Sequence, residues 1–285
     1  MPGGLSKAIR LAEGVANAQA GLGIDGAASW LLASLHEMGD QPAQAADQYA
    51  LIRLRGDSGR EVLRLEVKSR LQAGQPASAW RLIEDHEFDD TDLRVDTLAR
   101  LERYEDAAAE LVDASDTTRI CRWARLVGLD LQRPTEAVER LREWLTEHDD
   151  DQEAFTLIED LASRIGDVET TAWARQSLGR LVEGNPLARS KWLQRAAQVA
   201  ADATEAVDLL TEAMALDSAN DSIRSQLGHA LERKGDFDNA AQISLDLAES
   251  ADQIGQRVLH LLRAASNLRR IDAQRAIQIL DRVEA

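Results

Sequence analysis

The chain has 285 residues, a net charge of −17 and a hydrophobic fraction of 44%. This charge argues against nucleic acid as a partner, because binding to phosphates needs clustered lysine and arginine side chains. It also argues against a basic helix on a membrane surface, and no run of about 18 apolar residues predicts a membrane span. The hydrophobic content is sufficient for a long continuous core.

The N-terminal sequence Met1-Pro2-Gly3-Gly4 has no basic region followed by an apolar stretch, so it predicts no signal peptide. The single cysteine, Cys121, has no partner for an internal disulfide. We therefore expect a cytoplasmic protein, unless the chain is a fragment of a longer one. Four lysines among 33 cations leave 29 arginines, which indicates a GC-rich bacterial genome or an acidic, lysine-poor surface adapted to high salt.

The first predicted element is an N-terminal helix within residues 1–24, near Leu5–Ala18. It carries Leu5, Ile9, Leu11 and Val15 together with several alanines. A stack of repeated units needs a cap, because an end unit exposes its stacking face. We expect this helix to cap that end of the chain.

From residue 25 to residue 285 a pattern centred on alanine recurs. The markers are Ala45, Ala79, Ala107, Ala137, Ala172 or Ala174, Ala206, Ala240 and Ala276. Their spacing runs from 28 residues (Ala79 to Ala107) to 36 (Ala240 to Ala276). A period of this length predicts one small unit used many times, and hence a single array over residues 1–285 in which each unit packs on its neighbours.

Each copy predicts two helices joined by a tight turn. In the clearest copy Leu227, Gly228 and Leu231 share one face of the first helix. Ala240, Ser244 and Leu247 share one face of the second. Glycine followed by a polar residue marks the turn in four copies, where glycine accepts a positive φ and aspartate starts the next helix well: Gly39-Asp40, Gly74-Gln75, Gly166-Asp167 and Gly235-Asp236.

These residues resemble the tetratricopeptide repeat (TPR). Leu227, Gly228, Leu231 and Ala240 match the family pattern closely, whereas other copies mostly lack the Leu-Gly pair and only Pro186 stands where a terminal proline is expected. The resemblance covers roughly residues 25–285. It implies an all-α, right-handed α-solenoid of about eight helix-turn-helix repeats plus the N-terminal helix.

The TPR family is a scaffold used for many tasks, so the fold does not define the function. The resemblance implies a protein–protein interaction scaffold or adaptor that binds peptide segments or folded partners on its concave face. Two alternatives stay open. The chain is the non-catalytic region of a larger enzyme or of a secretion or assembly protein, or it is a structural protein that associates with itself.

The sequence contains no Gly-x-Ser-x-Gly, Walker, His-Glu-x-x-His or Cys-x-x-Cys motif. Its five histidines are far apart, and none has a second ligand at metal-binding spacing. We therefore expect no enzymatic activity, no catalytic residue, no metal and no cofactor.

Two acidic runs, at residues 84–92 and 147–151, have enough carboxylates to attract a divalent cation, but neither has the ligand order of a calcium loop. The favoured interpretation is that their carboxylates cap the following helices. We expect Cys121 to be a small packing residue. The alternative is a reactive thiol, because Cys121 lies between Arg119 and Arg122 and nearby cations lower a thiol pKa.

The candidate binding residues lie on first helices. Lys191 and Arg195 surround Trp192, a combination that can hold an acidic peptide or a terminal carboxylate. His229 and Arg233 are predicted to turn away from the core side of their helix. The alternative for Trp192 is a core residue with solvated charges on either side.

The last predicted helix ends at Ala285 with an apolar side and no successor. It offers Ile277, Leu280 and Val283, or Ile279, to a neighbour. Either the chain continues in a longer protein, or this face binds a partner or a second copy of the chain, a two-fold contact being one way to make a homo-oligomer.

Overall fold

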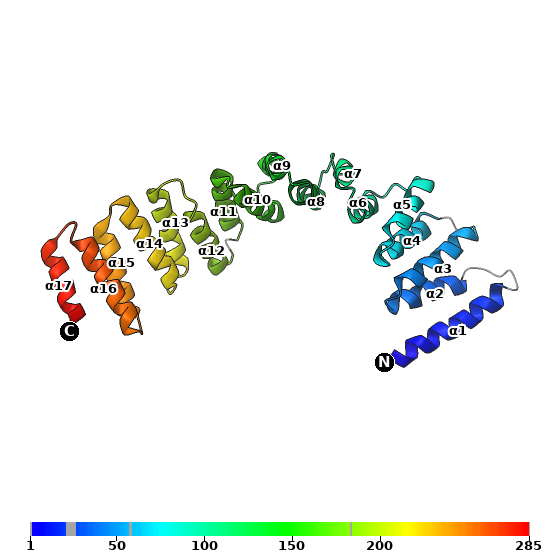
Figure 1. Ribbon diagram of the computed structural model, residues 1–285, viewed down its shortest axis with the longest axis horizontal. Coiled ribbons are helices and arrows are strands. Elements are labelled where there is room, and N and C mark those ends of the chain that lie inside the picture. Colours follow the sequence, from blue (N-terminus) through cyan, green and yellow to red (C-terminus); the bar gives the residue numbers. More distant parts are fainter. Residues whose placement is uncertain (1, 21–26, 57–58, 183, 285) are drawn as a thin grey trace. The chain divides into compact units, whose positions relative to one another are not determined.

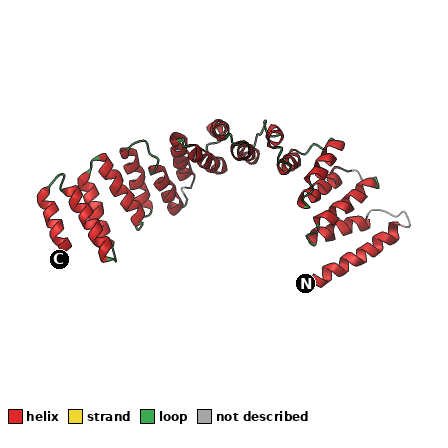
Figure 2. Cartoon of the chain, viewed as in Figure 1, coloured by secondary structure: helices red, strands yellow, loops and turns green. Residues whose placement is uncertain are grey.

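The computed structural model describes residues 2–20, 27–56, 59–182 and 184–284. In these residues every regular element is a helix, and no strand occurs (Figure 2). The chain divides into two compact units, which we call unit 1 (Met1–Ser115) and unit 2 (Asp116–Ala285). The all-α prediction is therefore confirmed, whereas a single array over residues 1–285 stays a prediction.

Unit 1 contains one leading helix and three helix pairs (Figure 1). These are α1 (Pro2–Ala20), the pair α2 (Ala27–Met38) and α3 (Pro42–Leu54), the pair α4 (Arg60–Gln72) and α5 (Pro76–Asp85), and the pair α6 (Thr91–Arg100) and α7 (Tyr104–Ala109). Within the unit each helix packs against the next one in the chain, as expected for a stack of repeated units.

Unit 2 contains five helix pairs. They are α8 (Thr117–Arg125) with α9 (Pro134–Glu147), α10 (Gln152–Ile165) with α11 (Val168–Leu181), α12 (Pro186–Ala197) with α13 (Ala203–Leu216), α14 (Asp221–Lys234) with α15 (Phe237–Ser250), and α16 (Ile254–Leu268) with α17 (Ala273–Glu284). A π-helical turn, Leu126–Asp130, continues α8. The described residues thus form eight pairs plus the leading helix, as the repeat predicts.

The repeated alanine marks a fixed register. In seven pairs it lies four residues after the residue that caps the second helix, and its backbone N–H donates to that residue's carbonyl, as from Ala240 to Asp236 at 3.1 Å. All seven of these alanines are buried. In the α10/α11 pair the same bond is made by Thr171 to Asp167 at 3.0 Å, so the marker there is Thr171 and neither Ala172 nor Ala174.

The small residues of the clearest copy are buried as expected. Leu227, Gly228 and Leu231 face the core from α14, and Ala240, Ser244 and Leu247 face it from α15. A Cβ atom added at Gly228 would lie 3.4 Å from Ile243 of α15. The absence of a side chain at this point lets the two helices approach closely.

The predicted turns are confirmed at three glycines and wrong at one. Gly74, Gly166 and Gly235 have φ angles of +70°, +73° and +85°, the left-handed conformation in which glycine carries no steric cost. After Gly39 the positive φ, 52°, falls instead on Asp40. That turn therefore uses the tolerance of aspartate for the left-handed region, and Asp40 does not cap α3, whose capping position is Gln41.

Helix α1 packs on α2 with one side only. Ala12 is buried, and Leu5 approaches Gly39 at the end of α2. Leu11 and Val15, which the sequence placed on the capping side, are instead exposed. Residues 1 and 21–24 of the predicted capping helix lie outside the described residues.

Candidate functional site

A hollow of about 520 Å³ lies on unit 2 between the first helices α12 and α14. It is lined by Ala188, Lys191, Trp192, Gln194, Arg195, Gln198, Ser222 and Gln226. Three of the five candidate binding residues, Lys191, Trp192 and Arg195, therefore lie together in one surface depression. We call this depression the α12/α14 hollow.

The side chains of the hollow are arranged around an indole. The guanidinium carbon of Arg195 lies 4.9 Å from the centre of the Trp192 ring, a cation–π contact that holds this cation against an apolar surface. Trp192 is half-buried, so it is neither a fully buried core residue nor a free one. Across the hollow, Gln194 donates to the Ser222 hydroxyl at 3.1 Å and so connects α12 to α14.

No carboxylate belongs to the described lining of this hollow. Nearby cations of unit 2 are neutralised, since Arg189 contacts Glu212 and Arg175 contacts Glu159 at 2.7 Å. Lys191 and Arg195 make no ion pair with any described residue, and both side chains are exposed. The α12/α14 hollow is thus a local positive area on a strongly acidic protein.

A second hollow, which we call the α14/α16 hollow, lies between the next two first helices and contains His229. Arg195, His229 and Arg263 are each 34 residues apart, so they hold the same position on α12, α14 and α16. Arg263 donates to the His229 ring at 2.8 Å and to Glu232 at 2.7 Å. Asn267 donates to the same carboxylate at 2.7 Å.

This network sets the ionisation of its members. Burial lowers the pKa of His229, the charge of Arg263 lowers it further, and Glu232 acts in the opposite direction. The hydrogen bond from Arg263 lowers the pKa of Glu232. His229 is therefore neutral and accepts a hydrogen bond from Arg263, whose charge is compensated by Glu232. Arg195, at the same position on α12, has no carboxylate partner.

Arg233, the fifth candidate, is exposed near the end of α14 and lines neither hollow. The sequence interpretation missed several lining residues: Gln194, Gln198, Ser222 and Gln226 in the first hollow, and Leu259, Leu262, Arg263 and Arg270 in the second. The period itself would have found Arg263, because adding 34 to His229 reaches it. The glutamines carry no such signal.

Cys121 is not an activated thiol. Burial raises the pKa of its thiol to about 12, Glu153 and Asp151 act in the same direction, and only Arg125 opposes them. The prediction of a small packing residue is therefore confirmed, and the alternative of a thiol activated by the flanking arginines is wrong, because the side chain is fully buried within unit 2. Cys121 is a packing residue.

The acidic runs cap helices as predicted. Asp90 accepts from the backbone N–H of Leu93 at 3.1 Å at the start of α6. Asp151 accepts from Ala154 at 3.0 Å at the start of α10, and also from the Trp144 indole at 2.9 Å. Although burial raises the pKa of Asp151, these hydrogen bonds outweigh it and leave the pKa below its usual value. The described residues contain no cluster of three or more metal-ligating side chains.

The candidate self-association residues divide between two sides of α17. Ile277 and Leu280 are exposed. Ile279 is buried and Val283 packs against the core that α17 shares with α16, so these two are not available to a neighbour. Among the described helices none is long and apolar enough to cross a lipid bilayer.

No family model matches the sequence, and no curated protein matches it. Solved structures do resemble this chain at a low level, and three of them serve as examples. The hetero-tetramer of Cut9 and Hcn1 from the APC/C has 13% identity and a TM-score of 0.32, with 90% of this chain and 55% of that one covered. Naa15/Naa10 bound to HypK-THB has 14% identity and a TM-score of 0.29, with 98% of this chain and 60% of that one covered. The TPR2AB domain of yeast Sti1 in complex with pHSP90 has 11% identity and a TM-score of 0.27, with 89% of this chain and 96% of that one covered.

This chain spans less than two thirds of the length of the first two chains. Matches at these identities and TM-scores give no information about the ligands of this chain. The likeness to the TPR family rests on this chain's own architecture: eight helix pairs with a buried small residue at one fixed position of each second helix.

Proposed function

We propose that the protein is a non-enzymatic scaffold whose unit 2 binds an acidic segment of a partner protein in the α12/α14 hollow. The observation that carries this proposal is the composition of the hollow. Two cations without carboxylate partners flank an indole, on a chain whose net charge is −17. The net negative charge of the chain repels an acidic ligand, so an uncompensated positive hollow selects where such a ligand can bind.

The side chains supply three kinds of contact. Lys191 and Arg195 attract carboxylates, and the planar guanidinium of Arg195 can bind one through two hydrogen bonds. The Trp192 ring offers an apolar surface for an aromatic or aliphatic side chain of the ligand. Gln194 and Gln226 present amides that can donate to and accept from a peptide backbone. This combination suits an extended acidic peptide with one apolar residue.

The proposal is tested by fluorescence anisotropy with a labelled peptide of alternating aspartate and glutamate residues around one central leucine. Replacing Lys191 and Arg195 with alanine removes both free cations and should weaken binding at least tenfold. Since both side chains are exposed and without ion pairs, the free energy of unfolding should stay within about 0.5 kcal/mol of the parent. Binding should also weaken as salt is added.

Arg180 provides the matched control, because it is an exposed cation on the second helix α11 of the same unit and lies outside the hollow. Arg180→Ala makes a charge change of the same kind and should leave the affinity within twofold. If Arg180→Ala weakens binding as much as the substitutions in the hollow, only the overall charge matters and the proposed site is wrong. An unchanged affinity of the Lys191→Ala/Arg195→Ala variant would also contradict it.

A further inference from the structure

The α14/α16 hollow contains a second arginine that lies against an aromatic ring. Arg270, which follows the end of α16, lines this hollow together with Phe237, the first residue of α15. The guanidinium carbon of Arg270 lies 4.7 Å from the centre of the Phe237 ring, and that of Arg195 lies 4.9 Å from the Trp192 ring. Each hollow therefore holds one cation in place over an apolar surface.

The charge of Arg270 is not compensated. Its side chain is exposed, and it makes no ion pair with any described residue. The described lining of the hollow includes one carboxylate, Glu232, which already accepts from Arg263 and from Asn267, both at 2.7 Å. Of the two arginines in this hollow, Arg263 is thus occupied within the fold, whereas Arg270 is available to a ligand.

One face of α14 leads from the first hollow to the second. Ser222 and Gln226 line the α12/α14 hollow, and His229 lines the α14/α16 hollow. Arg233 follows them at the same helical spacing, since the four residues stand at positions i, i+4, i+7 and i+11. Residues at this spacing share one side of a helix, so Arg233 lies on the face that connects the two hollows.

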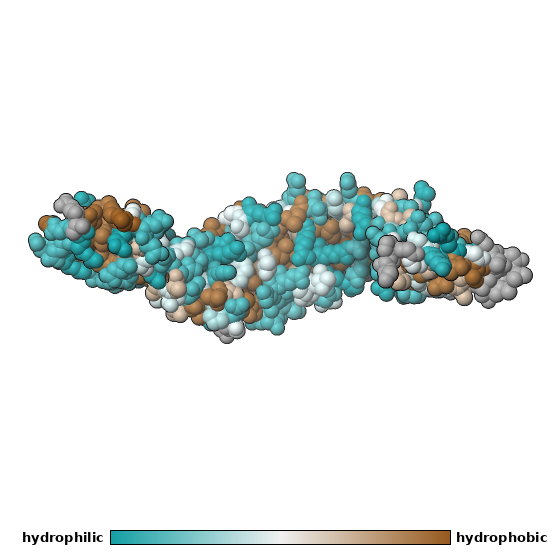
Figure 3. Space-filling model, turned by 90° about the horizontal axis from the view of Figure 1, so that it is seen from below, coloured by the Kyte–Doolittle hydropathy of each residue, from teal (hydrophilic) through white to brown (hydrophobic). Residues whose placement is uncertain are grey.

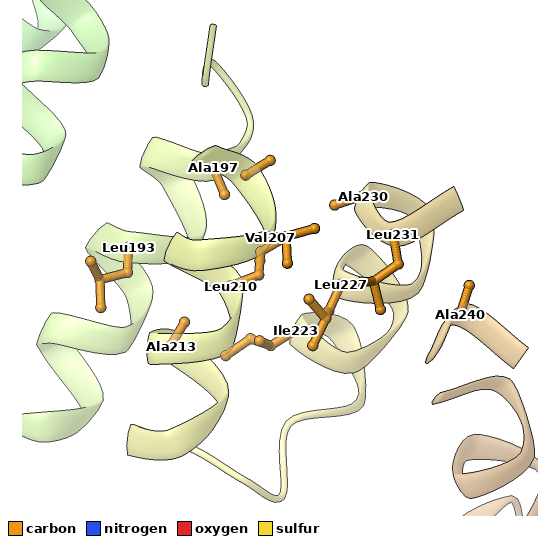
Figure 4. Packing of buried hydrophobic residues seen from close by; sticks show 11 residues of the cluster. Leu193, Ala197, Val207, Leu210, Ala213, Ile223, Leu227, Ala230, Leu231 and Ala240 are labelled. Atoms are coloured by element: carbon orange, nitrogen blue, oxygen red, sulfur yellow. The ribbon is translucent and has the colours of Figure 1, made fainter. Parts of the chain in front are cut away.

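The core side of α14 fixes the direction of this face. Leu227, Ala230 and Leu231 are buried there, in a cluster that includes residues of α13 (Figure 4). Arg233 lies away from this side, is exposed and makes no ion pair with any described residue. It is therefore a further uncompensated cation, placed between Arg195 on α12 and Arg270 after α16.

The three first helices follow one another within unit 2. Gln194 of α12 donates to Ser222 of α14 at 3.1 Å, and Arg263 of α16 donates to Glu232 of α14 at 2.7 Å. Because packed helices have axes about 10 Å apart, the cations of α12 and α16 are separated by two such steps, or about 20 Å. An extended chain advances about 3.3–3.6 Å per residue, so about six residues cover this separation.

On the basis of the proposed function, we infer that the acidic partner segment continues past the α12/α14 hollow, across Arg233, and that Arg270 binds a second acidic cluster in the α14/α16 hollow. The segment that fits has two acidic clusters about six residues apart. Figure 3 shows a largely hydrophilic surface on unit 2 with smaller hydrophobic areas, which suits a ligand that is mostly charged. Once the first cluster is bound, binding of the second becomes intramolecular and raises the affinity.

Two labelled peptides test this inference by fluorescence anisotropy. The short peptide has one acidic cluster around a leucine, and the long peptide adds a second acidic cluster after a spacer of six glycine and serine residues. The long peptide should bind the parent about tenfold more tightly than the short one. Arg270→Ala should remove this gain and leave the affinity for the short peptide within twofold, whereas Arg270→Lys keeps the charge and should retain most of the gain.

The matched control is Arg282→Ala, which removes an exposed arginine of α17 outside both hollows and should leave both affinities within twofold. A long peptide whose spacer is cut to one residue should lose the gain, because its clusters no longer reach both cations. Circular dichroism verifies that each variant keeps its helical signal.

The outcomes separate this inference from the proposed function. If the long peptide binds no more tightly than the short one, or if Arg282→Ala removes as much of the gain as Arg270→Ala, the second subsite is wrong. The proposed function is decided independently, by the effect of Lys191→Ala/Arg195→Ala on the short peptide.

Discussion

Two hollows occupy comparable places in the two units, each between successive first helices, yet their charges differ. In unit 1 the hollow between α4 and α6 has a volume of about 480 Å³ and mixes both signs of charge: Glu61, Asp90, Asp92 and Asp96 with Arg64, Lys68 and Arg100. In unit 2 the α12/α14 hollow has cations alone. The same repeated geometry therefore offers a self-compensated surface in one unit and an uncompensated one in the other.

Two cations of the unit 1 hollow are occupied within the unit. Arg64 contacts Asp90 at 3.4 Å, and Arg100 donates to the carbonyl of Leu71 at 2.6 Å. The extreme case is Glu66, whose side chain is fully buried between Arg53, at 2.8 Å, and Arg70, at 3.0 Å. The comparison teaches that in this chain an ion pair within a unit stabilises the fold, whereas a cation without one is available to a ligand.

The largest expected effect tests this assignment in unit 1. Glu66→Gln removes the buried carboxylate and leaves two arginines near each other without a counter-charge. Breaking a buried charge network by removing one partner costs about 3 kcal/mol or more. The free energy of unfolding from urea titration should fall by about that amount. A loss below about 1 kcal/mol would mean that water replaces the carboxylate and that the network adds little.

The second largest effect concerns the packing of unit 2. Ala240 is completely buried at the marker position of α15, against Leu227 and Leu231 of α14. Ala240→Leu adds three carbons at this close contact and should destabilise the protein by about 1–3 kcal/mol through overpacking. Ala251→Leu is the control, because Ala251 follows the end of α15 and is only partly buried. Equal stability of Ala240→Leu and the parent would show that the core can expand here.

Together these two variants also test the division into units. If unit 1 and unit 2 unfold separately, Glu66→Gln should lower the unfolding temperature of unit 1 alone and Ala240→Leu that of unit 2 alone. If the chain unfolds as the single array expected from the repeat, both should shift one common transition. Calorimetry of the parent and of both variants distinguishes the two results.

The fold was predictable because the period and the small residues report directly on packing. A buried position such as Ala240 accepts only a small side chain, so an alanine recurs there in seven of the eight pairs. The register in the α10/α11 pair was missed because Thr171 fits the same space, with its hydroxyl bonded to the Asp167 carbonyl at 2.7 Å. A threonine carries no alanine signature, although its spacing of 34 residues from Ala137 was visible.

The candidate site was predictable only in part, because exposure depends on tertiary packing. Trp192 and its two cations were found as neighbours in sequence, on one helix. The residues opposite them, Ser222 and Gln226, lie about one period further along and are common polar types, so nothing in the sequence marked them. The exposed or buried state of Ile277 and Ile279 followed from the rotation of α17 about its axis.

A smaller effect is expected from making the hollow of unit 1 resemble that of unit 2. Replacing Glu61 with Gln, and Asp92 and Asp96 with Asn, removes three carboxylates and leaves the cations of that hollow. The variant should gain weak binding of the acidic peptide, with a dissociation constant in the millimolar range, about −4 kcal/mol. Anisotropy in the Lys191→Ala/Arg195→Ala background isolates this new binding. Absence of any binding would show that charge without an indole is insufficient.

The smallest effect concerns the α14/α16 hollow. There Glu232 compensates the charge of Arg263, and the pKa of His229 depends on both. Burial and Arg263 lower the pKa of His229, so the folded protein favours its neutral form. The stability that this preference contributes is present above the ordinary histidine pKa of about 6.5 and is lost as the pH falls from there through the lower folded value. A titration by NMR should therefore place the His229 pKa below 6.5.

Two substitutions should move that pKa in opposite directions. Arg263→Gln removes a positive charge beside the ring and leaves Glu232 free to attract the imidazolium, so the pKa of His229 should rise toward its ordinary value. Glu232→Gln removes the one neighbour that favours protonation and should lower the pKa further. Because the ring stays partly exposed, both shifts should decrease in high salt. If Arg263→Gln leaves the titration unchanged, the hydrogen bonds from Arg263 do not persist in solution, and Arg263 would then be as free to bind a ligand as Arg195 in the α12/α14 hollow.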